Sequence, residues 1–200
     1  MIITSPQQLS ATRPSERETL KWLARGKSVA VDVGTFRGGT AHCLLEAMPK
    51  GFVFTIDTFE GRTGGDLIAT WPKPILLEDV QMNLAEFDGR CAIVVGESTA
   101  FAVAFKDRFA DLVFLDAGHD YESVKADINA WLPKIKSGGI ICGHDYDRYV
   151  SHYIPPECIA KHSHLDFCEN HLCHPGVIRA VDEVFRDVKY RDSIWWVEVS

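Results

Sequence analysis

Short apolar runs, rich in β-branched residues, recur along the chain, and a polar or glycine-rich stretch follows each one. Five of these runs are too short for helices and are typical of strands buried on both faces of a sheet. They lie at residues 28–33, 51–57, 90–95, 111–116 and 140–143. Between them, apolar positions with a helical period predict helices over 41–48, 75–87, 99–105 and 122–132. The alternation predicts an α/β domain with a mostly parallel sheet.

The two ends of the chain add further elements to this core. Ser15-Glu16-Arg17-Glu18 resembles a capping box that opens a short amphipathic helix ending at Gly26. Near the other end, the pattern predicts a helix over 177–187 and a hairpin of strands 188–190 and 194–199. The sheet would then have seven strands.

Composition limits the kinds of partner. The chain has 200 residues, of which 46% are hydrophobic, and this suits one domain over 1–200 with a full core. Its net charge is −7, and it has no basic run, so nucleic acid is not an expected partner, whereas a small-molecule substrate is. No apolar run is as long as a membrane span, and the N-terminus lacks the features of a signal peptide. We therefore expect a cytoplasmic protein, without a membrane partner, whose six cysteines are thiols.

Two adjacent tryptophans stand in the last predicted strand. Because side chains alternate along a strand, Trp195 and Trp196 point to opposite faces of the sheet. We expect one in the core and the other at a subunit contact of a homo-oligomer.

A strand, a glycine turn and a helix meet at residues 28–48, a unit that presents backbone N–H groups to a ligand. Gly34 lets the chain turn, and the glycines at 38 and 39 permit close approach to the backbone. Asp32, near the end of the buried strand, needs a donor, which a ligand's ammonium or the turn's own N–H groups would supply. Phe36 breaks the G-x-G-x-x-G spacing of dinucleotide sites and so disfavours an NAD-linked oxidoreductase.

Acidic residues stand at or just after the C-terminal ends of all five strands. They are Asp32, Asp57, Glu97, Asp116 and Asp145. In an open parallel sheet these ends form one crevice, so we expect the acids to converge there.

The positions of these acids predict contacts with a nucleotide. Asp57 stands where a carboxylate accepts hydrogen bonds from a ribose diol, although it could instead serve as a turn or capping residue. Glu97 and Ser98 would be within reach of an adenine. Alternatively, Glu97 is a solvated turn residue, and Ser98 can cap the next helix.

Two later stretches carry a more specific resemblance. Residues 116–127 read D-A-G-H-D-Y-E-S-V-K-A-D, and residues 138–146 read G-G-I-I-C-G-H-D-Y. With the glycine turn and Asp57, they resemble the small-molecule class I S-adenosylmethionine (SAM) methyltransferases that include macrocin O-methyltransferase. The resemblance covers roughly residues 28–199 and also includes a helix at 175–185; Ala117 departs from the usual glycine.

This resemblance implies a Rossmann-like class I methyltransferase fold, with a mostly parallel seven-stranded sheet, helices on both faces and an antiparallel terminal strand. It implies methyl transfer from SAM to a small-molecule hydroxyl. The residues expected to contact the cofactor are Asp32, Gly34, Thr35, Phe36, Gly38, Thr40, Asp57, Thr58, Glu97, Ser98 and Asp116.

The resemblance also implies a divalent metal in many members of this group. Its ligands would map onto Asp116 and Asp145, with His144 beside them, and carboxylate oxygens suit Mg²⁺. A metal would lower the pKa of a substrate hydroxyl, and His119 is a plausible base for its proton. Asp116, His119 and His144 are therefore the expected catalytic residues. Two alternatives remain: His119 caps the next helix, or Asp116 holds the methionine part of SAM without a metal.

Residues 146–174 form an insert that does not fit the α/β alternation. The segment 152–174 holds five of the eight histidines and three of the six cysteines. Cys158, His162, Cys168 and Cys173, or a mixed set with His171 or His174, would suit a tetrahedral Zn²⁺ site. The insert could instead be a substrate lid, or both, or a chance cluster on a polar loop. A second polar, glycine-rich loop, 58–73, is also expected near the cofactor.

Competing functions stay open at this point. The first is an N-methyltransferase or a metal-free member of the same fold. The second is a non-catalytic SAM- or nucleotide-binding module whose insert binds zinc.

Overall fold

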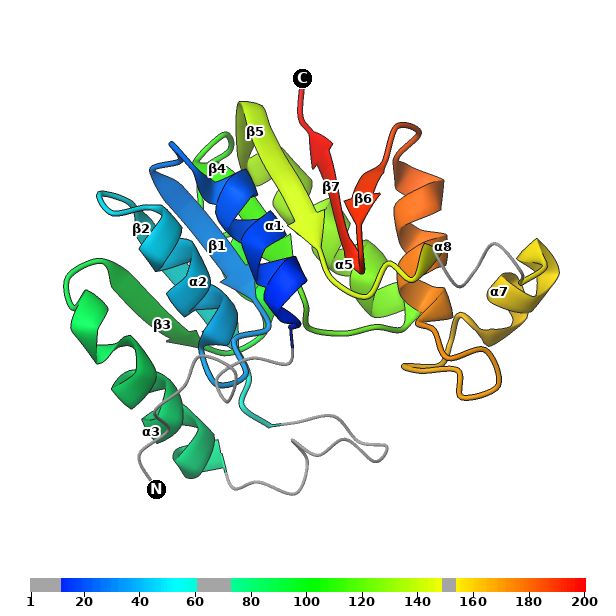
Figure 1. Cartoon of the computed structure of the whole chain (residues 1–200), viewed down its shortest axis with the longest axis horizontal. Coiled ribbons are helices and arrows are strands. Elements are labelled where there is room, and N and C mark those ends of the chain that lie inside the picture. Colours follow the sequence, from blue (N-terminus) through cyan, green and yellow to red (C-terminus); the bar gives the residue numbers. More distant parts are fainter. Residues whose placement is uncertain (1–11, 61–72, 149–153) are drawn as a thin grey trace.

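A computed structural model describes residues 12–60, 73–148 and 154–200, with no side-chain description for 73–76, and shows one seven-stranded sheet between two layers of helices (Figure 1). The strand order is β3-β2-β1-β4-β5-β7-β6. The strands are β1 Val29–Val33, β2 Phe52–Asp57, β3 Cys91–Val95, β4 Ala110–Leu115, β5 Ile135–Gly143, β6 Lys189–Arg191 and β7 Ile194–Glu198. Strands β1 to β5 are parallel, whereas β7 is antiparallel to both β5 and β6. The predicted sheet, including its C-terminal hairpin, is confirmed.

Helices cover both faces of this sheet. They are α1 Pro14–Ala24, α2 Gly39–Ala47, α3 Lys73–Leu84, α4 Ser98–Ala102, α5 Tyr121–Trp131, α7 Pro156–His162 and α8 Pro175–Val184. Side chains of α1, α2 and α3 form one apolar cluster with the sheet, and side chains of α4, α5, α7 and α8 form the other. Along β4, Leu112 and Phe114 face the first cluster while Val113 and Leu115 face the second, as the two-residue period of a strand requires. This explains the unbroken apolar runs in the sequence.

Several element boundaries differ from the sequence prediction, and those of α1 and β5 are the two described here. Helix α1 begins at Pro14, so the capping acid is Glu16, whose Oε2 accepts a hydrogen bond from the Arg13 backbone N–H at 2.6 Å. Proline fits the first helical position because its missing N–H is not needed there. Strand β5 begins at Ile135, five residues before the apolar run, and its pairing with β4 shifts register between Ala110 and Leu112.

The expectation of a tryptophan at a subunit contact is wrong. Trp195 is 1% exposed and Trp196 is 7% exposed, because helices cover both faces of β7. On the α1 side, Trp22 packs edge-on against Trp196, with ring centroids 5.7 Å apart. The two tryptophans therefore give no support for a homo-oligomer, which stays a prediction. Within the described parts of the chain, no helix is both long and apolar enough to cross a membrane.

Candidate active site

The C-terminal ends of the five parallel strands lie along one edge of the sheet (Figure 1). Across that edge the order of the predicted residues is Glu97, Asp57, Gly34, Asp116 and Asp145, which follow or end β3, β2, β1, β4 and β5. The strand order reverses between β1 and β4, and open α/β sheets bind ligands at such a point. The acids therefore converge as predicted, with the glycine turn at the centre.

The glycine turn is packed directly onto the end of β4. Gly34 has a φ of +94°, and a Cβ there would stand 1.9 Å from the carbonyl oxygen of Asp116. No other residue fits at this position. Gly38, the N-cap of α2, has a φ of +83°, and a Cβ there would meet the Leu84 side chain at 3.3 Å. Because Gly38 has no side chain, α3 can pack closely against the glycine turn.

Asp32 lies fully buried beneath this turn. Its Oδ2 accepts a hydrogen bond from the Thr55 hydroxyl at 2.7 Å, and Thr55 in turn contacts the hydroxyl of Thr35. The donor that the structure supplies is thus a side chain of β2 and not an N–H group of the turn, whereas Oδ1 has no hydrogen-bond partner among the described residues. Burial raises the pKa of Asp32 to about 8, the nearby charges of Asp116 and Asp57 add to this rise, and the Thr55 hydrogen bond opposes it.

Asp57 fixes two neighbouring loops with its carboxylate. Oδ2 accepts a hydrogen bond from the Phe36 backbone N–H at 2.9 Å, and Oδ1 accepts one from the Phe59 N–H at 2.8 Å. Both phenylalanines have positive φ values, 48° and 54°. Asp57 therefore acts as a turn residue, as one of the two predictions proposed. Each of its carboxylate oxygens keeps a further lone pair for a ligand hydroxyl.

The remaining cofactor candidates lie around this centre. Thr58 directly follows Asp57, Thr40 is buried in the first turn of α2, and Glu97 is exposed beyond the end of β3. Glu97 is the N-cap of α4, so the prediction that Ser98 caps this helix is wrong. Ser98 Oγ instead accepts a hydrogen bond from Nε1 of Trp131 at 2.7 Å, because α5 brings that ring over the start of α4.

His119 and Asp145 meet where β4 and β5 end. Nε2 of His119 lies 3.1 Å from Oδ2 of Asp145 and 3.5 Å from Oδ1 of Asp116. Neither contact has the geometry of a hydrogen bond, so this buried Nε2 has no hydrogen-bond partner among the described residues. Asp120, not His119, caps α5 through Ser123. The predicted alternative of a capping His119 is therefore wrong.

His144 occupies the other side of Asp145. Its Nδ1 lies 3.0 Å from Oδ1 of Asp145 and 3.8 Å from Oδ1 of Asp116. Its Nε2 lies 3.2 Å from Oε2 of Glu16, a carboxylate of α1 that is only 1% exposed. Asp145 itself adopts a φ of 58°, a left-handed conformation that is uncommon outside glycine but that aspartate adopts more readily than most residues.

Three further groups reach this cluster, and all of them belong to the insert. Asp166 places Oδ1 3.0 Å from Nδ1 of His119. Nδ1 of His174 lies 2.8 Å from Oδ2 of Asp147 and 3.5 Å from Oδ1 of Asp145. Side chains from the described part of the insert thus contact residues that follow β4 and β5, and a role as a substrate lid stays a prediction.

Opposite charges dominate the pKa values in this cluster. Burial lowers the pKa of His119, but the carboxylates of Asp116, Asp145 and Asp166 outweigh it and raise the pKa well above 6.5. Burial also lowers the pKa of His144, but the carboxylates of Asp116 and Asp145 outweigh it and raise that pKa well above its ordinary value. Burial raises the pKa of Asp145, but the histidines outweigh it and hold that pKa well below 3.8.

The cluster has more negative than positive groups. Five carboxylates, those of Glu16, Asp116, Asp145, Asp147 and Asp166, face three imidazoles, those of His119, His144 and His174. An excess of negative charge remains even when all three imidazoles are protonated. Asp116, His144 and Asp145 each offer a ligand atom within 4.8 Å of the others. This donor set fits a divalent cation.

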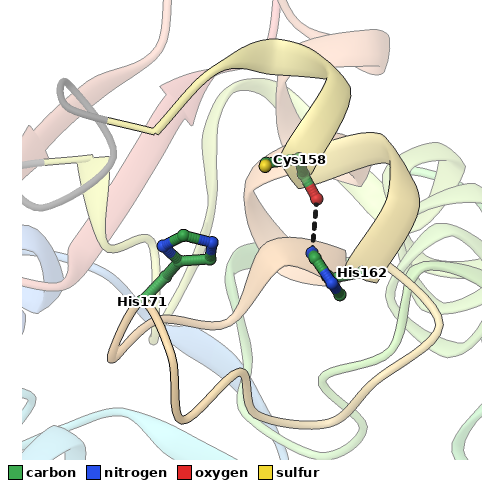
Figure 2. A group of neighbouring side chains, drawn as sticks. All are labelled: Cys158, His162 and His171. Atoms are coloured by element: carbon green, nitrogen blue, oxygen red, sulfur yellow. Dashed lines mark hydrogen bonds between the residues drawn. The ribbon is translucent and has the colours of Figure 1, made fainter.

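The predicted zinc ligands separate into two groups. Cys158 and His162 lie together with His171, as Figure 2 shows, so a mixed set is the one that the structure assembles. Cys168 and Cys173 are 2% and 0% exposed, and they pair backbone to backbone with an N···O distance of 2.9 Å. Their side chains are buried, and neither belongs to a metal-binding group among the described residues.

Sequence reasoning did not place Glu16, Asp147 or Asp166 in the site. The sequence predicts Glu16 only as part of a capping box. Asp166 stands in a segment with no periodic pattern. His174 was considered only as a zinc ligand. Their roles depend on how α1 and the insert pack against the sheet edge, which no local motif encodes.

Comparison with known proteins places this geometry in a family. A family model described as a methyltransferase domain matches residues 31–146. The uncharacterized protein y4gI of Sinorhizobium fredii is 25% identical over 119 residues, which is 58% of this chain and 13% of y4gI. The chain therefore spans only about an eighth of the length of this curated relative.

Solved structures share the fold at low sequence identity. The O-methyltransferase TomG of Streptomyces achromogenes, solved with SAM, is 18% identical with a TM-score of 0.67, covering 95% of this chain and 82% of TomG. An O-methyltransferase of Bacillus cereus, solved with SAH, is 19% identical with a TM-score of 0.61, over 96% and 85% of the two chains. Podospora anserina PaMTH1, solved with SAH, is 14% identical with a TM-score of 0.66, over 99% and 83%.

The fold is that of the class I SAM-dependent methyltransferases. The chain belongs to the family of methyltransferase domains.

Proposed function

We propose that this protein transfers the methyl group of SAM to a hydroxyl oxygen of a small molecule, and that a divalent cation held by Asp116, Asp145 and His144 assists the transfer. The observation that carries the proposal is the position of His119. Its buried Nε2 faces Asp116 and Asp145, beside the point where the strand order reverses. The similar O-methyltransferases of Streptomyces achromogenes and Bacillus cereus were solved with SAM and SAH, and this supports the choice of donor.

The glycine turn and Asp57 would hold the cofactor. Asp57 lies at the end of β2, next to the turn, and its oxygens have lone pairs left for a ribose diol. Glu97, at the next strand end, would lie beside the adenine. The unpartnered Oδ1 of Asp32 fits a cofactor ammonium, because a buried carboxylate oxygen without a donor is costly.

His119 is the proposed base for the hydroxyl proton. Because Asp166 accepts a hydrogen bond at Nδ1, the Nε2 of a neutral His119 would be the nitrogen with a free lone pair. The carboxylates of Asp116, Asp145 and Asp166 raise the pKa of His119, and a cation bound to Asp116 and Asp145 would offset their charge and favour the neutral imidazole that a base requires. That nitrogen faces the carboxylates of Asp116 and Asp145, where a substrate oxygen would be held. SAM would supply the methyl group to the hydroxyl oxygen, with its sulfonium sulfur as the leaving atom, and His119 would take the hydroxyl proton.

The cation would bind where negative charge is in excess. A divalent ion there would lower the pKa of a bound hydroxyl and orient it. His144 is fixed from its other side by Glu16, which orients the imidazole. The described part of the insert would cover the acceptor, because Asp166 and His174 already reach into the cluster from it.

Calorimetric titration with SAH, in the presence and absence of Mg²⁺, tests the donor. We expect micromolar binding to the wild-type protein, and no measurable binding would overturn the proposal. Electron paramagnetic resonance of added Mn²⁺ in the presence of SAH tests the cation separately. We expect Asp145→Asn to lose most Mn²⁺ binding while it keeps its SAH affinity.

A matched control is Asp192→Asn, because Asp192 is exposed and has a similar positive φ of 53°. It should bind Mn²⁺ as the wild type does. Equal Mn²⁺ binding by wild type and Asp145→Asn would contradict the cation site and leave the SAM assignment standing. Tritiated SAM with a panel of hydroxylated and amino acceptors then distinguishes O- from N-methylation.

A further inference from the structure

We propose that Cys158, His162 and His171 form a Zn²⁺ site that fastens the insert in its closed position over the active site. One ligand atom from each residue lies within 4.8 Å of the other two. Cys158 and His162 stand one turn apart on α7, and His171 approaches them from the loop that leads to α8 (Figure 2).

The His162 side chain and the backbone that carries His171 are fixed by hydrogen bonds before any metal binds. Nδ1 of His162 lies 2.9 Å from the Cys158 carbonyl oxygen, and the dashed line in Figure 2 marks this bond. Since a carbonyl only accepts, Nδ1 carries the proton, and Nε2 holds the free lone pair. The backbone N–H of His171 donates to the Cys168 carbonyl at 3.1 Å, which fixes the loop under the third ligand.

The chemistry of these donors suits zinc. One thiolate and two imidazoles are common zinc ligands, and bond lengths of about 2.0–2.3 Å require donor atoms roughly 3.5 Å apart in a tetrahedral site. The present donors lie within 4.8 Å of one another, so their side chains would move closer together on binding. On binding, the Cys158 thiol loses its proton to solvent, a Zn–S bond forms, and a water fills the fourth position.

This site is separate from the active-site cluster. The other two groups of potential ligands, His119–Asp145–His174 and Asp116–His144–Asp145, share Asp145. The third group shares no residue with either. All three of its members are half-buried, so a metal ion can reach them from solvent.

The segment that the zinc would close buries Ser163, Cys168 and Cys173 but exposes two of its large apolar side chains. Between His162 and Pro175, Phe167 and Leu172 are 41% and 69% exposed, so they add little to the core. Yet this segment carries Asp166, which lies against His119. A metal that ties His171 to α7 would close the loop around Asp166, because metal binding energy stabilises the folded arrangement of its ligands.

Cobalt titration of the chelator-treated, reduced protein tests the site. We expect one equivalent of Co²⁺ to give the visible bands of tetrahedral coordination and a thiolate-to-cobalt charge-transfer band, and Zn²⁺ to remove both. Cys158→Ser should lose the charge-transfer band, and His171→Gln should weaken binding about tenfold or more. His164→Gln, on the same loop but exposed and outside the group, should match the wild type.

Two further measurements distinguish the insert site from the active-site cluster and test whether zinc stabilises the loop. Asp145→Asn should keep the charge-transfer band, because only the insert site contains a cysteine. Hydrogen exchange of residues 163–174 should slow on addition of Zn²⁺ in the wild type and not in His171→Gln. No charge-transfer band in the wild type, or an equal band in Cys158→Ser, would overturn the proposal. SAH binding, measured on the same samples, shows whether each variant is folded and tests the methyltransferase assignment independently.

Discussion

Asp166 lies 3.0 Å from Nδ1 of His119, although the two residues are 47 positions apart and belong to different parts of the fold. His119 follows β4, and Asp166 stands in the insert between α7 and α8. The contact connects the closed position of the insert to the orientation of the proposed base. In the proposed reaction, such a pair would make proton removal by His119 depend on the position of the segment that carries Asp166.

The first prediction concerns this contact. Asp166→Asn should lower kcat about 10- to 100-fold, because the amide orients the imidazole less firmly than a carboxylate does. The dissociation constant for SAH should stay within about twofold, since Asp166 lies outside the proposed cofactor contacts. Radiometric turnover and calorimetry measure the two quantities, with the exposed Glu169→Gln as the control. Loss of SAH binding in Asp166→Asn would show instead that the residue supports the fold.

Asp57→Ala should weaken SAH binding about 10- to 100-fold, the loss expected when charge-assisted hydrogen bonds are removed. The substitution removes the proposed ribose ligand and also frees the N–H groups of Phe36 and Phe59. Calorimetry measures the change, and the exposed turn residue Asp88, changed to Ala, is the matched control. Unchanged affinity in Asp57→Ala would remove the ribose assignment.

Gly34→Ala should destabilise the fold by more than about 4 kcal/mol, because its Cβ would stand 1.9 Å from the Asp116 carbonyl oxygen. Gly89→Ala separates this clash from the cost of a positive φ. Gly89 has a φ of +76° with nothing within 4 Å of an added Cβ, so the change should cost about 1–2 kcal/mol. Urea unfolding of both variants gives the comparison, and equal losses would mean that the end of β4 can move away.

The pH dependence of stability should include a contribution from Asp111. Burial raises its pKa, but hydrogen bonds from Lys136 and from the N–H groups of Val29 and Ser28 outweigh this and lower it. A lowered folded-state pKa stabilises the protein fully above the unfolded value of about 3.9 and progressively less as the pH falls below it.

Asp111→Asn should therefore lose about 1–3 kcal/mol of unfolding free energy at pH 7. The difference from wild type should stay constant down to about pH 5 and shrink below about pH 4. Urea unfolding at several pH values measures it, with Asp88→Asn as the control. A difference that grows toward low pH would contradict the assigned sign.

Much of the fold could be predicted from the sequence because parallel strands covered on both faces must be apolar throughout. The runs around Val31, Val53 and Val113 therefore identify their strands directly, and helical periods identify the helices between them. The prediction missed the start of β5, where exposed residues such as Ser137 and Gly138 interrupt the apolar pattern.

The sequence by itself determined the chemistry of the sheet edge: the glycine turn and an acid at or just after each parallel strand, because strand direction brings those ends together. Only the tertiary structure decided which side chains complete the site. Glu16 reaches His144 because α1 packs across the sheet, and Asp166 reaches His119 because the insert folds back over β4. The tertiary structure also places His171 beside Cys158. Cys168 and Cys173 do not join this group, since both of those thiols are buried in the insert. Contacts of this kind depend on packing between distant segments, for which no local periodicity exists.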